Sequence, residues 1–303
     1  MAKHTTIDIN SLIDSFGIKI PSADEFQKLN NFFPIYNDES DSILNFERGM
    51  LLYAMVGKNK PRTILEIGTA SGYSTICMAK ALTDFNIQGK IITIDPEPHN
   101  KKNRYVLNFD EKGSKTYEMS REELWNRCAS EEWIKKIQVI TGYSGEVFEK
   151  NNISKIDMAF IDGHHVFNAV KHDFYAILKS SSDKFQILFD DYFPGESKDV
   201  KQLVDEEIFP NFPIKLVKTN YKDQISNKLN SNLNNEHGIN DELFMCLIDS
   251  DDLKKPVSEI YSEEKINNFL KEYNKWESRW RRRKNLNSKI PFLKKIRFRN
   301  FLN

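Results

Sequence analysis

The sequence predicts an α/β fold, in which an open, mostly parallel sheet carries helices on both faces. The short apolar run at Ile64 and Leu65 continues to Ile67 and stops at Gly68. Gly72 follows, and a helical pattern begins at Tyr73. This order of strand, glycine turn and helix is the first crossover of a parallel sheet. Further short apolar runs alternate with helical patterns, which extends the same architecture along the chain.

The remaining elements follow from apolar periodicity and turn residues. Helices are expected at residues 45–56, 73–82, 120–125, 146–150, 166–179 and 199–208. Strands are expected at 90–95, 137–140, 156–162, 185–189, 214–218 and 243–248. The last two strands are joined by an Asn-rich loop, which favours an antiparallel hairpin at the sheet edge. Residues 1–60 are expected to be helical and partly irregular. The stretch 96–136 is longer than a usual connection and is a candidate lid, with a capping box at Ser120 and Glu123.

The composition indicates one large domain or one domain with appendages. We expect an N-terminal helical segment at 1–44, the main domain at 45–250 and a basic helical tail at 251–303. Lysine plus arginine and aspartate plus glutamate number 44 each, so the whole chain has no nucleic-acid signature. From residue 275 onward there are eleven lysine or arginine residues against one acid, so this end carries +10 and the rest −10.

Three widely separated cysteines argue against a disulfide framework and favour free thiols in a reducing compartment. The first residues lack the apolar core of a signal peptide, and no apolar run has the length of a membrane span. A cytoplasmic location is expected. Contact with the inner face of the membrane through residues 275–303 is left open.

The glycine turn is a candidate ligand site, because glycines let a ligand approach the backbone and a helix N-terminus offers unpaired N–H groups. Glu66 interrupts an apolar strand just before the turn, where an unpaired charge is costly. The next strand ends in Asp95, which is placed to accept both hydroxyls of a ribose. A plain capped turn without a ligand is the alternative. The spacing from Gly68 to Gly72 is not the dinucleotide pattern G-x-G-x-x-G.

Two further strands end in aspartate, at Asp162 and at Asp190 with Asp191. Ligands of open α/β sheets bind beyond the carboxyl ends of the strands, so these acids should converge. Carboxylates suit Mg²⁺, Ca²⁺ or Mn²⁺. Alternatively, Asp190 caps a turn and Asp191 is solvated. His164 and His165 follow Asp162, and one of them is expected to reach the cleft, where it can take a proton near neutral pH.

These motifs resemble a known family. Leu65–Ser74 resembles motif I of the class I S-adenosylmethionine-dependent methyltransferases, in its catechol-O-methyltransferase-like form. Phe160–His165, with Lys171 and Asp173 nearby, and Leu188–Tyr192 resemble the bacterial subfamily that includes macrocin-type sugar O-methyltransferases. The resemblance covers residues 45–250. It implies a Rossmann-like, seven-stranded, mostly parallel sheet whose last strand is antiparallel.

The resemblance also implies a site for S-adenosyl-L-methionine. It assigns the methionine end of this cofactor to Glu66, Gly68 and Ser74, with Gly72 closing the turn. Asp95 is expected to hold the ribose. Ser144 falls where the family uses a serine near the adenine. The next residue, often glutamine in the family, is Gly145 here.

The acceptor side is implied in the same way. Asp162, Asp190 and Asp191 match the family's ligands for Mg²⁺ or another divalent cation, and His165 matches its general base. In the implied O-methylation the cation binds two adjacent substrate oxygens and lowers the pKa of one hydroxyl. His165 then removes the proton, and the oxygen attacks the sulfonium methyl group in line.

The implied function is metal-assisted O-methylation of a small molecule or sugar with vicinal hydroxyls. Two alternatives stay open: an RNA methyltransferase that uses the basic tail, and a non-catalytic relative that only binds S-adenosylmethionine. The absence of an N/D-P-P-Y motif counts against methylation of base nitrogens. Oligomeric state is left open.

Two charged regions have no assigned role. Glu47 and Arg48 lie near the start of an apolar helix, and they are either surface charges or ligand-facing groups. The stretch from Trp276 to Lys284 is a basic, aromatic helix candidate. Its tryptophans either pack on the core, lie on an anionic membrane or bind RNA.

Overall fold

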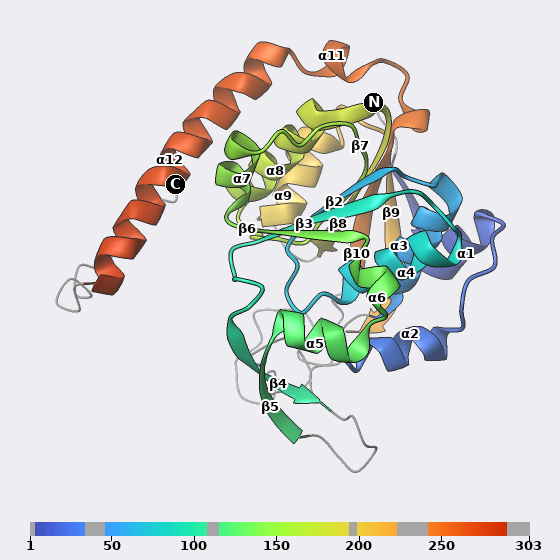
Figure 1. Ribbon diagram of the computed structural model, residues 1–303. Helices are drawn as coiled ribbons and strands as arrows, with labels where there is room; N and C mark the ends of the chain where they lie inside the picture. Colours follow the sequence, from blue (N-terminus) through green and yellow to red (C-terminus); the bar gives the residue numbers. More distant parts are fainter. Residues whose placement is uncertain (1–3, 34–45, 108–114, 194–198, 223–241, 290–303) are drawn as a thin grey trace, which may run out of the picture.

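The computed structural model describes residues 4–33, 46–107, 115–193, 199–222 and 242–289 (Figure 1). Its centre is an eight-stranded sheet in the order β1-β9-β10-β8-β7-β2-β3-β6. The strands are β1 (His4–Asp8), β2 (Thr63–Ile67), β3 (Lys90–Asp95), β6 (Ile137–Thr141), β7 (Ile156–Ile161), β8 (Ser181–Tyr192), β9 (Ile214–Lys222) and β10 (Glu242–Asp249). The α/β, Rossmann-like prediction is confirmed.

Strands β6, β3, β2, β7 and β8 are parallel neighbours, with β2 at their centre. Their carboxyl ends therefore share one edge of the sheet. β10 is antiparallel to both β8 and β9, which confirms the antiparallel strand and the hairpin expected from the sequence.

The eighth strand, β1, was not expected, because the start of the chain was interpreted as helical. β1 pairs in parallel with β9, from His4 opposite Ile214 to Asp8 opposite Lys218. Its sequence is mostly polar, so main-chain pairing rather than an apolar alternation makes it a strand. The β9–β10 hairpin is consequently covered by β1 and does not form the edge of the sheet.

Helices cover both faces of the sheet (Figure 1). One face carries α1 (Ile9–Ser15), α2 (Ala23–Asn30), α3 (Phe46–Asn59), α4 (Tyr73–Asp84) and α6 (Glu131–Ile134). The other carries α7 (Ser144–Lys150), α8 (Phe167–Ser180), α9 (Asp199–Leu203) with the π-helical turn η1 (Val204–Ile208), and α12 (Glu263–Lys289). Adjacent residues of β2 enter opposite cores: Ile64 packs in the first and Leu65 in the second. Both layers bury apolar side chains, which fixes the strand ends in space.

The connection after β3 contains a hairpin that the sequence did not reveal, formed by β4 (Lys102–Leu107) and β5 (Lys115–Ser120). In Figure 1 it extends from the end of the sheet at which β3 stops. The expected helix follows as α5 (Arg121–Cys128). Its capping box is confirmed: the Glu123 N–H donates to Ser120 Oγ, and the Ser120 N–H donates to Glu123 Oε2.

After β10 come the short turns η2 (Ser250–Asp252) and α11 (Val257–Ile260), and then the 27-residue helix α12. α12 lies along the outside of α7 and α8 (Figure 1). Within the described ranges, no helix is both long enough and apolar enough to cross a membrane. The three cysteines are free thiols, as expected.

Candidate active site

The glycine turn between β2 and α4 is packed too tightly for side chains at either end. Gly68 and Gly72 have φ angles of +97° and +106°, which L-residues rarely adopt. A Cβ atom on Gly68 would lie 1.9 Å from the carbonyl oxygen of Asp162, and one on Gly72 would lie 2.4 Å from Trp125 Nε1. The turn therefore touches the end of β7 on one side and α5 on the other.

Glu66 is fully buried below this turn and is the centre of a hydroxyl network. Its carboxylate accepts hydrogen bonds from Ser74 Oγ at 2.5 Å and Thr93 Oγ1 at 2.6 Å, and also from Thr75 Oγ1. Burial raises the pKa of Glu66 to about 7, although the three hydroxyls oppose this shift. The network joins β2, β3 and the first turn of α4, so it holds the glycine turn in place.

Asp95, at the end of β3, also bonds to the turn. Its Oδ2 accepts from the Thr69 N–H at 3.1 Å and the Ala70 N–H at 2.9 Å, and its Oδ1 accepts from the Glu97 N–H at 2.7 Å. Arg121 Nη2 lies 3.3 Å from the same Oδ1. Three N–H groups therefore donate to this carboxylate, and Arg121 adds an ion pair, while the Arg121 Nη2 hydrogen bond goes to the Glu97 carbonyl oxygen. Three donors leave part of the acceptor capacity of the carboxylate available.

The acids at the ends of β7 and β8 surround an arginine from α3 whose side chain is 14% exposed. Arg48 Nη1 donates to Asp162 Oδ2 at 2.7 Å and to Asp190 Oδ2 at 2.5 Å. Asp190 is 3% exposed, and its other oxygen, Oδ1, has no partner among the described residues. Burial by itself would lower the pKa of Arg48, but Asp162, Asp190 and Asp191 together raise it, so the guanidinium stays charged.

On the outer side of the cluster, His165 faces Asp191 and Asp162. Its Nε2 lies 2.9 Å from Asp191 Oδ2 and 3.8 Å from Asp162 Oδ1. One ligand atom from each of these three residues lies within 4.8 Å of the others, a spacing that could hold a metal ion. The side chain of His165 is 51% exposed. His164 is exposed and joins neither acid in the hydrogen bonds and ion pairs of the described residues.

The charges set the protonation of this cluster. The carboxylates of Asp162 and Asp191 raise the pKa of His165 to about 11. Burial opposes ionisation of Asp191, but His165 and Arg48 outweigh it and lower the pKa of that carboxyl. Burial raises the pKa of Asp190 against the pull of Arg48. With Arg48 and His165 both charged, two cations face three carboxyl groups, and Asp190 is the one whose ionisation burial disfavours.

Ser144 begins α7, just beyond the carboxyl end of β6. The following residue has to be small, because a Cβ on Gly145 would lie 2.8 Å from Glu277 Oε2 and from Asn274 Oδ1 of α12. Glu277 is 3% exposed and accepts the Glu146 N–H at 3.0 Å. The C-terminal helix thus contributes a buried carboxylate beside the serine.

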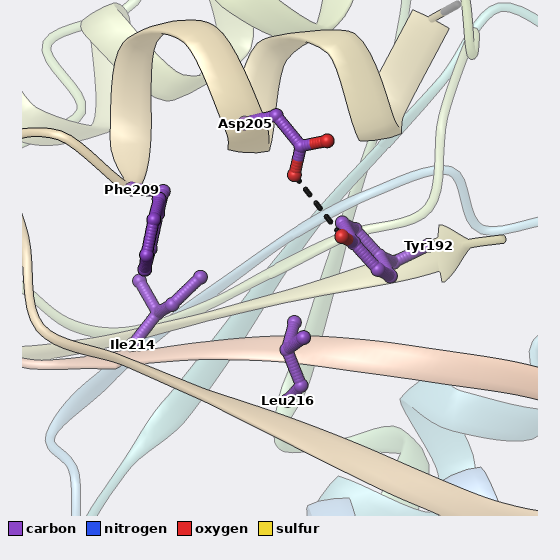
Figure 2. A pocket seen from close by; sticks show the side chains of 5 residues that line it. All are labelled: Tyr192, Asp205, Phe209, Ile214 and Leu216. Atoms are coloured by element: carbon purple, nitrogen blue, oxygen red, sulfur yellow. Dashed lines mark hydrogen bonds between the residues drawn. The ribbon is translucent and has the colours of Figure 1, made fainter. Parts of the chain in front are cut away.

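A pocket of about 280 Å³ lies near the end of β8 (Figure 2). It is lined by Tyr192, Asp205, Phe209, Ile214 and Leu216. Figure 2 shows the Tyr192 hydroxyl directed at Asp205, to which it donates a hydrogen bond of 3.0 Å. The pocket contains none of the predicted site residues, so it is separate from the acid cluster.

The predicted site residues form two adjoining groups at the carboxyl edge of the sheet. Turn residues and Asp95 make the first, and the three acids with His165 make the second. They meet where Gly68 abuts Asp162. Ser144 stands at the end of β6, two strands from β2.

Sequence reasoning missed Arg121 and Glu277, and it left open whether Arg48 is a surface charge or a ligand-facing group. For Arg48 the signal was present, since a charged pair opens an otherwise apolar helix. Arg121 is 1% exposed, and its Nε and Nη1 have no partner among the described residues. The positions of Arg121 and Glu277 depend on long-range packing, which no local pattern encodes.

The chain was compared with known proteins. Residues 65–192 match the family model described as a methyltransferase domain. A search among curated proteins found no match. Similar solved structures include the O-methyltransferase TomG from Streptomyces achromogenes in complex with SAM, at 17% identity and TM-score 0.45, covering 78% of this chain and 94% of that one. Another is an O-methyltransferase from Bacillus cereus in complex with SAH, at 18% identity and TM-score 0.45, covering 78% and 99%.

Proposed function

We propose that the chain, whose residues 65–192 match a methyltransferase-domain model, is a class I methyltransferase that transfers the methyl group of S-adenosylmethionine to a hydroxyl oxygen with the help of a divalent cation. The acceptor is a small molecule or sugar with vicinal hydroxyls. One observation carries the proposal: the glycine turn and the acid cluster are in direct contact, with the position of a Gly68 Cβ only 1.9 Å from the Asp162 carbonyl oxygen. A donor on the turn and an acceptor at the acids would then be neighbours.

The turn supplies the donor side. Glu66 fixes Ser74 and the start of α4 through its hydroxyl network, so the N-terminus of α4 is held in place for the methionine end of the cofactor. Because Gly68 and Gly72 have no side chains, the cofactor can approach the main chain of the turn. Asp95 would take a ribose hydroxyl with the acceptor capacity that its three N–H donors leave, and Ser144 is the residue that we assign to the adenine.

The acid cluster fits a divalent cation. Asp162, Asp190 and Asp191 offer hard oxygen donors, and the buried Asp190 Oδ1 has no partner among the described residues. A Mg²⁺ ion held there would lower the pKa of a bound substrate hydroxyl. Arg48 holds Asp162 and Asp190 in position and offsets part of their mutual repulsion.

His165 serves as the general base. Its half-exposed ring lies beside Asp191 and can reach a substrate at the same edge. With its pKa raised to about 11, the imidazole is protonated at neutral pH and cannot accept a proton. Positive charge placed on Asp162 and Asp191 would weaken the attraction that holds this proton, so His165 becomes a base when the acids are neutralised.

The test is methyl transfer from radiolabelled S-adenosylmethionine to a panel of catechols and sugars. We expect labelling of a vicinal-diol acceptor with Mg²⁺, loss of labelling in EDTA and recovery when Mg²⁺ is restored. Full activity in EDTA would reduce the carboxylates to a structural role. Labelling of nitrogen rather than oxygen in the product would reject O-methylation.

A further inference from the structure

The outer face of α12 combines exposed tryptophans with exposed cations. Trp276 and Trp280 are 44% and 37% exposed, and they are the exposed large hydrophobic residues of the described part of the chain. They lie one helical turn apart. Exposed cations surround them, and we call the whole set the basic–aromatic face: Lys275, Trp276, Arg279, Trp280, Arg282 and Arg283.

The opposite face of α12 is bonded to α7, so the two exposed tryptophans lie on a helix that is held in place. Arg281 pairs with Glu146 of α7 at 2.5 Å, and the buried Glu277 accepts the Glu146 N–H. The tryptophans are themselves ordered by their neighbours. Trp276 stacks on Trp280 with ring centroids 6.2 Å apart, and Trp280 packs edge-on against Tyr143.

The charge of this face is of one sign. Between residues 275 and 284 the sole acid is Glu277, which is buried against α7. The sequence from 275 to the end carries +10, and the rest of the chain carries −10. An exposed surface of positive charge selects an anionic partner, while the negative charge of the rest of the chain disfavours other orientations toward that partner.

We propose that the basic–aromatic face docks on an anionic lipid surface. Indole rings are amphipathic and favour the headgroup region of a bilayer, and arginine and lysine side chains attract anionic headgroups. An RNA base stacks on a tryptophan only where a face of the indole ring is free. Here Trp276 stacks on Trp280, and Lys284 Nζ lies 5.0 Å over the Trp280 ring. These contacts favour lipid over RNA.

Docking through the basic–aromatic face would bring the candidate site close to the lipid surface. Lys284 Nζ donates to the Tyr143 hydroxyl at 3.0 Å, and Tyr143 follows the carboxyl end of β6. The basic end of α12 thus lies toward the edge of the sheet that carries the acids and the glycine turn (Figure 1). A docked chain would present that edge near the lipid headgroups.

The test is sedimentation of the full chain with vesicles of phosphatidylcholine alone or mixed with phosphatidylglycerol. We expect the chain to pellet with the mixed vesicles and to stay in solution with the neutral ones. Each cation near such a surface changes partitioning about fivefold, so Arg279→Glu with Arg283→Glu should weaken binding at least about 25-fold. Trp276→Ala with Trp280→Ala should also weaken it and abolish a blue shift of tryptophan emission.

The matched control is Lys254→Glu with Lys255→Glu, which reverses two exposed charges just before α11. This variant should bind the mixed vesicles nearly as well as the unaltered chain. Equal pelleting of all variants, or no pelleting of the unaltered chain, would overturn the proposal. So would tight binding of a single-stranded RNA oligonucleotide that displaces the chain from vesicles and survives loss of both tryptophans.

Discussion

Arg48 Nη1 donates to Asp162 and to Asp190 at once, at 2.7 and 2.5 Å. One nitrogen from α3 therefore joins the ends of β7 and β8 inside the candidate site. Three carboxylates at one edge would repel one another, and the guanidinium reduces this repulsion while it also lowers the attraction of the cluster for a second cation. The acid cluster is thus partly neutralised before any ligand arrives.

Replacing Arg48 with methionine should destabilise the fold by about 3 to 5 kcal/mol, because it leaves the buried Asp190 without its counter-charge. Denaturant unfolding measures the change. Arg62→Met is the matched control, since Arg62 is exposed, and it should stay within about 0.5 kcal/mol of the unaltered chain. Equal free energies of unfolding for the two variants would show that the ion pairs of Arg48 make no net contribution to stability.

Glu66 predicts a pH dependence of stability. Its pKa is about 7 in the folded chain and 4.5 in the unfolded one, because burial disfavours the charged form. Between these values the unfolded chain releases its proton first, so stability falls as the pH rises, by at most about 3 kcal/mol.

Glu66→Gln removes this ionisation and keeps a hydrogen-bonding amide in the network. Its free energy of unfolding should therefore vary less between pH 4.5 and pH 7 than that of the unaltered chain. Urea unfolding at several pH values measures both curves. Parallel curves would mean that Glu66 does not titrate in this range.

Replacing His165 with alanine should lower turnover by about 10²- to 10⁴-fold, the usual contribution of a general base, with little change in S-adenosylmethionine binding. Calorimetric binding and initial rates separate the two effects. His164→Ala is the control, because His164 is exposed and joins neither acid in the described contacts. Unchanged turnover in His165→Ala would remove this residue from the mechanism.

Gly68 should tolerate no side chain. Gly68→Ala adds a Cβ that meets the Asp162 carbonyl oxygen at 1.9 Å, and the φ angle of +97° adds strain. Gly17→Ala isolates the strain, since Gly17 has φ +65° and its Cβ would have no neighbour within 4 Å. We expect about 1 kcal/mol for Gly17→Ala and clearly more for Gly68→Ala, measured by denaturant unfolding. Similar losses of unfolding free energy in the two variants would mean that the turn shifts to accommodate the added Cβ atom.

The sequence predicted the parts of the site that depend on local order. The carboxyl ends of parallel strands lie at one edge of the sheet. Acids that end such strands, and a glycine turn that follows one, are therefore expected at that edge. That logic located Asp95, Asp162 and Asp190 at one edge. It could not show that Asp190 bonds Arg48, which depends on how α3 packs across the sheet, or that His165 faces Asp191, which depends on the path of the chain after β7.

The same limit explains the missed elements. β1 is mostly polar and is a strand through main-chain pairing. The β4–β5 hairpin buries Tyr105, Leu107 and Met119 in the core, but polar residues between them leave no apolar run that reveals the strands in the sequence. The contact of Glu277 with α7 joins residues 131 positions apart. Only the folded chain brings such groups together.

In the proposed function, the glycine turn and the acid cluster form one site. Paramagnetic relaxation measures this directly, with Mn²⁺ as the cation and S-adenosylmethionine carrying a carbon-13 methyl group. We predict strong Mn²⁺-induced relaxation of the bound methyl carbon, which is lost when Asp162 and Asp191 are both replaced by asparagine. Binding of S-adenosylmethionine without any effect of Mn²⁺ on its methyl carbon, or an effect that survives both replacements, would contradict a shared site.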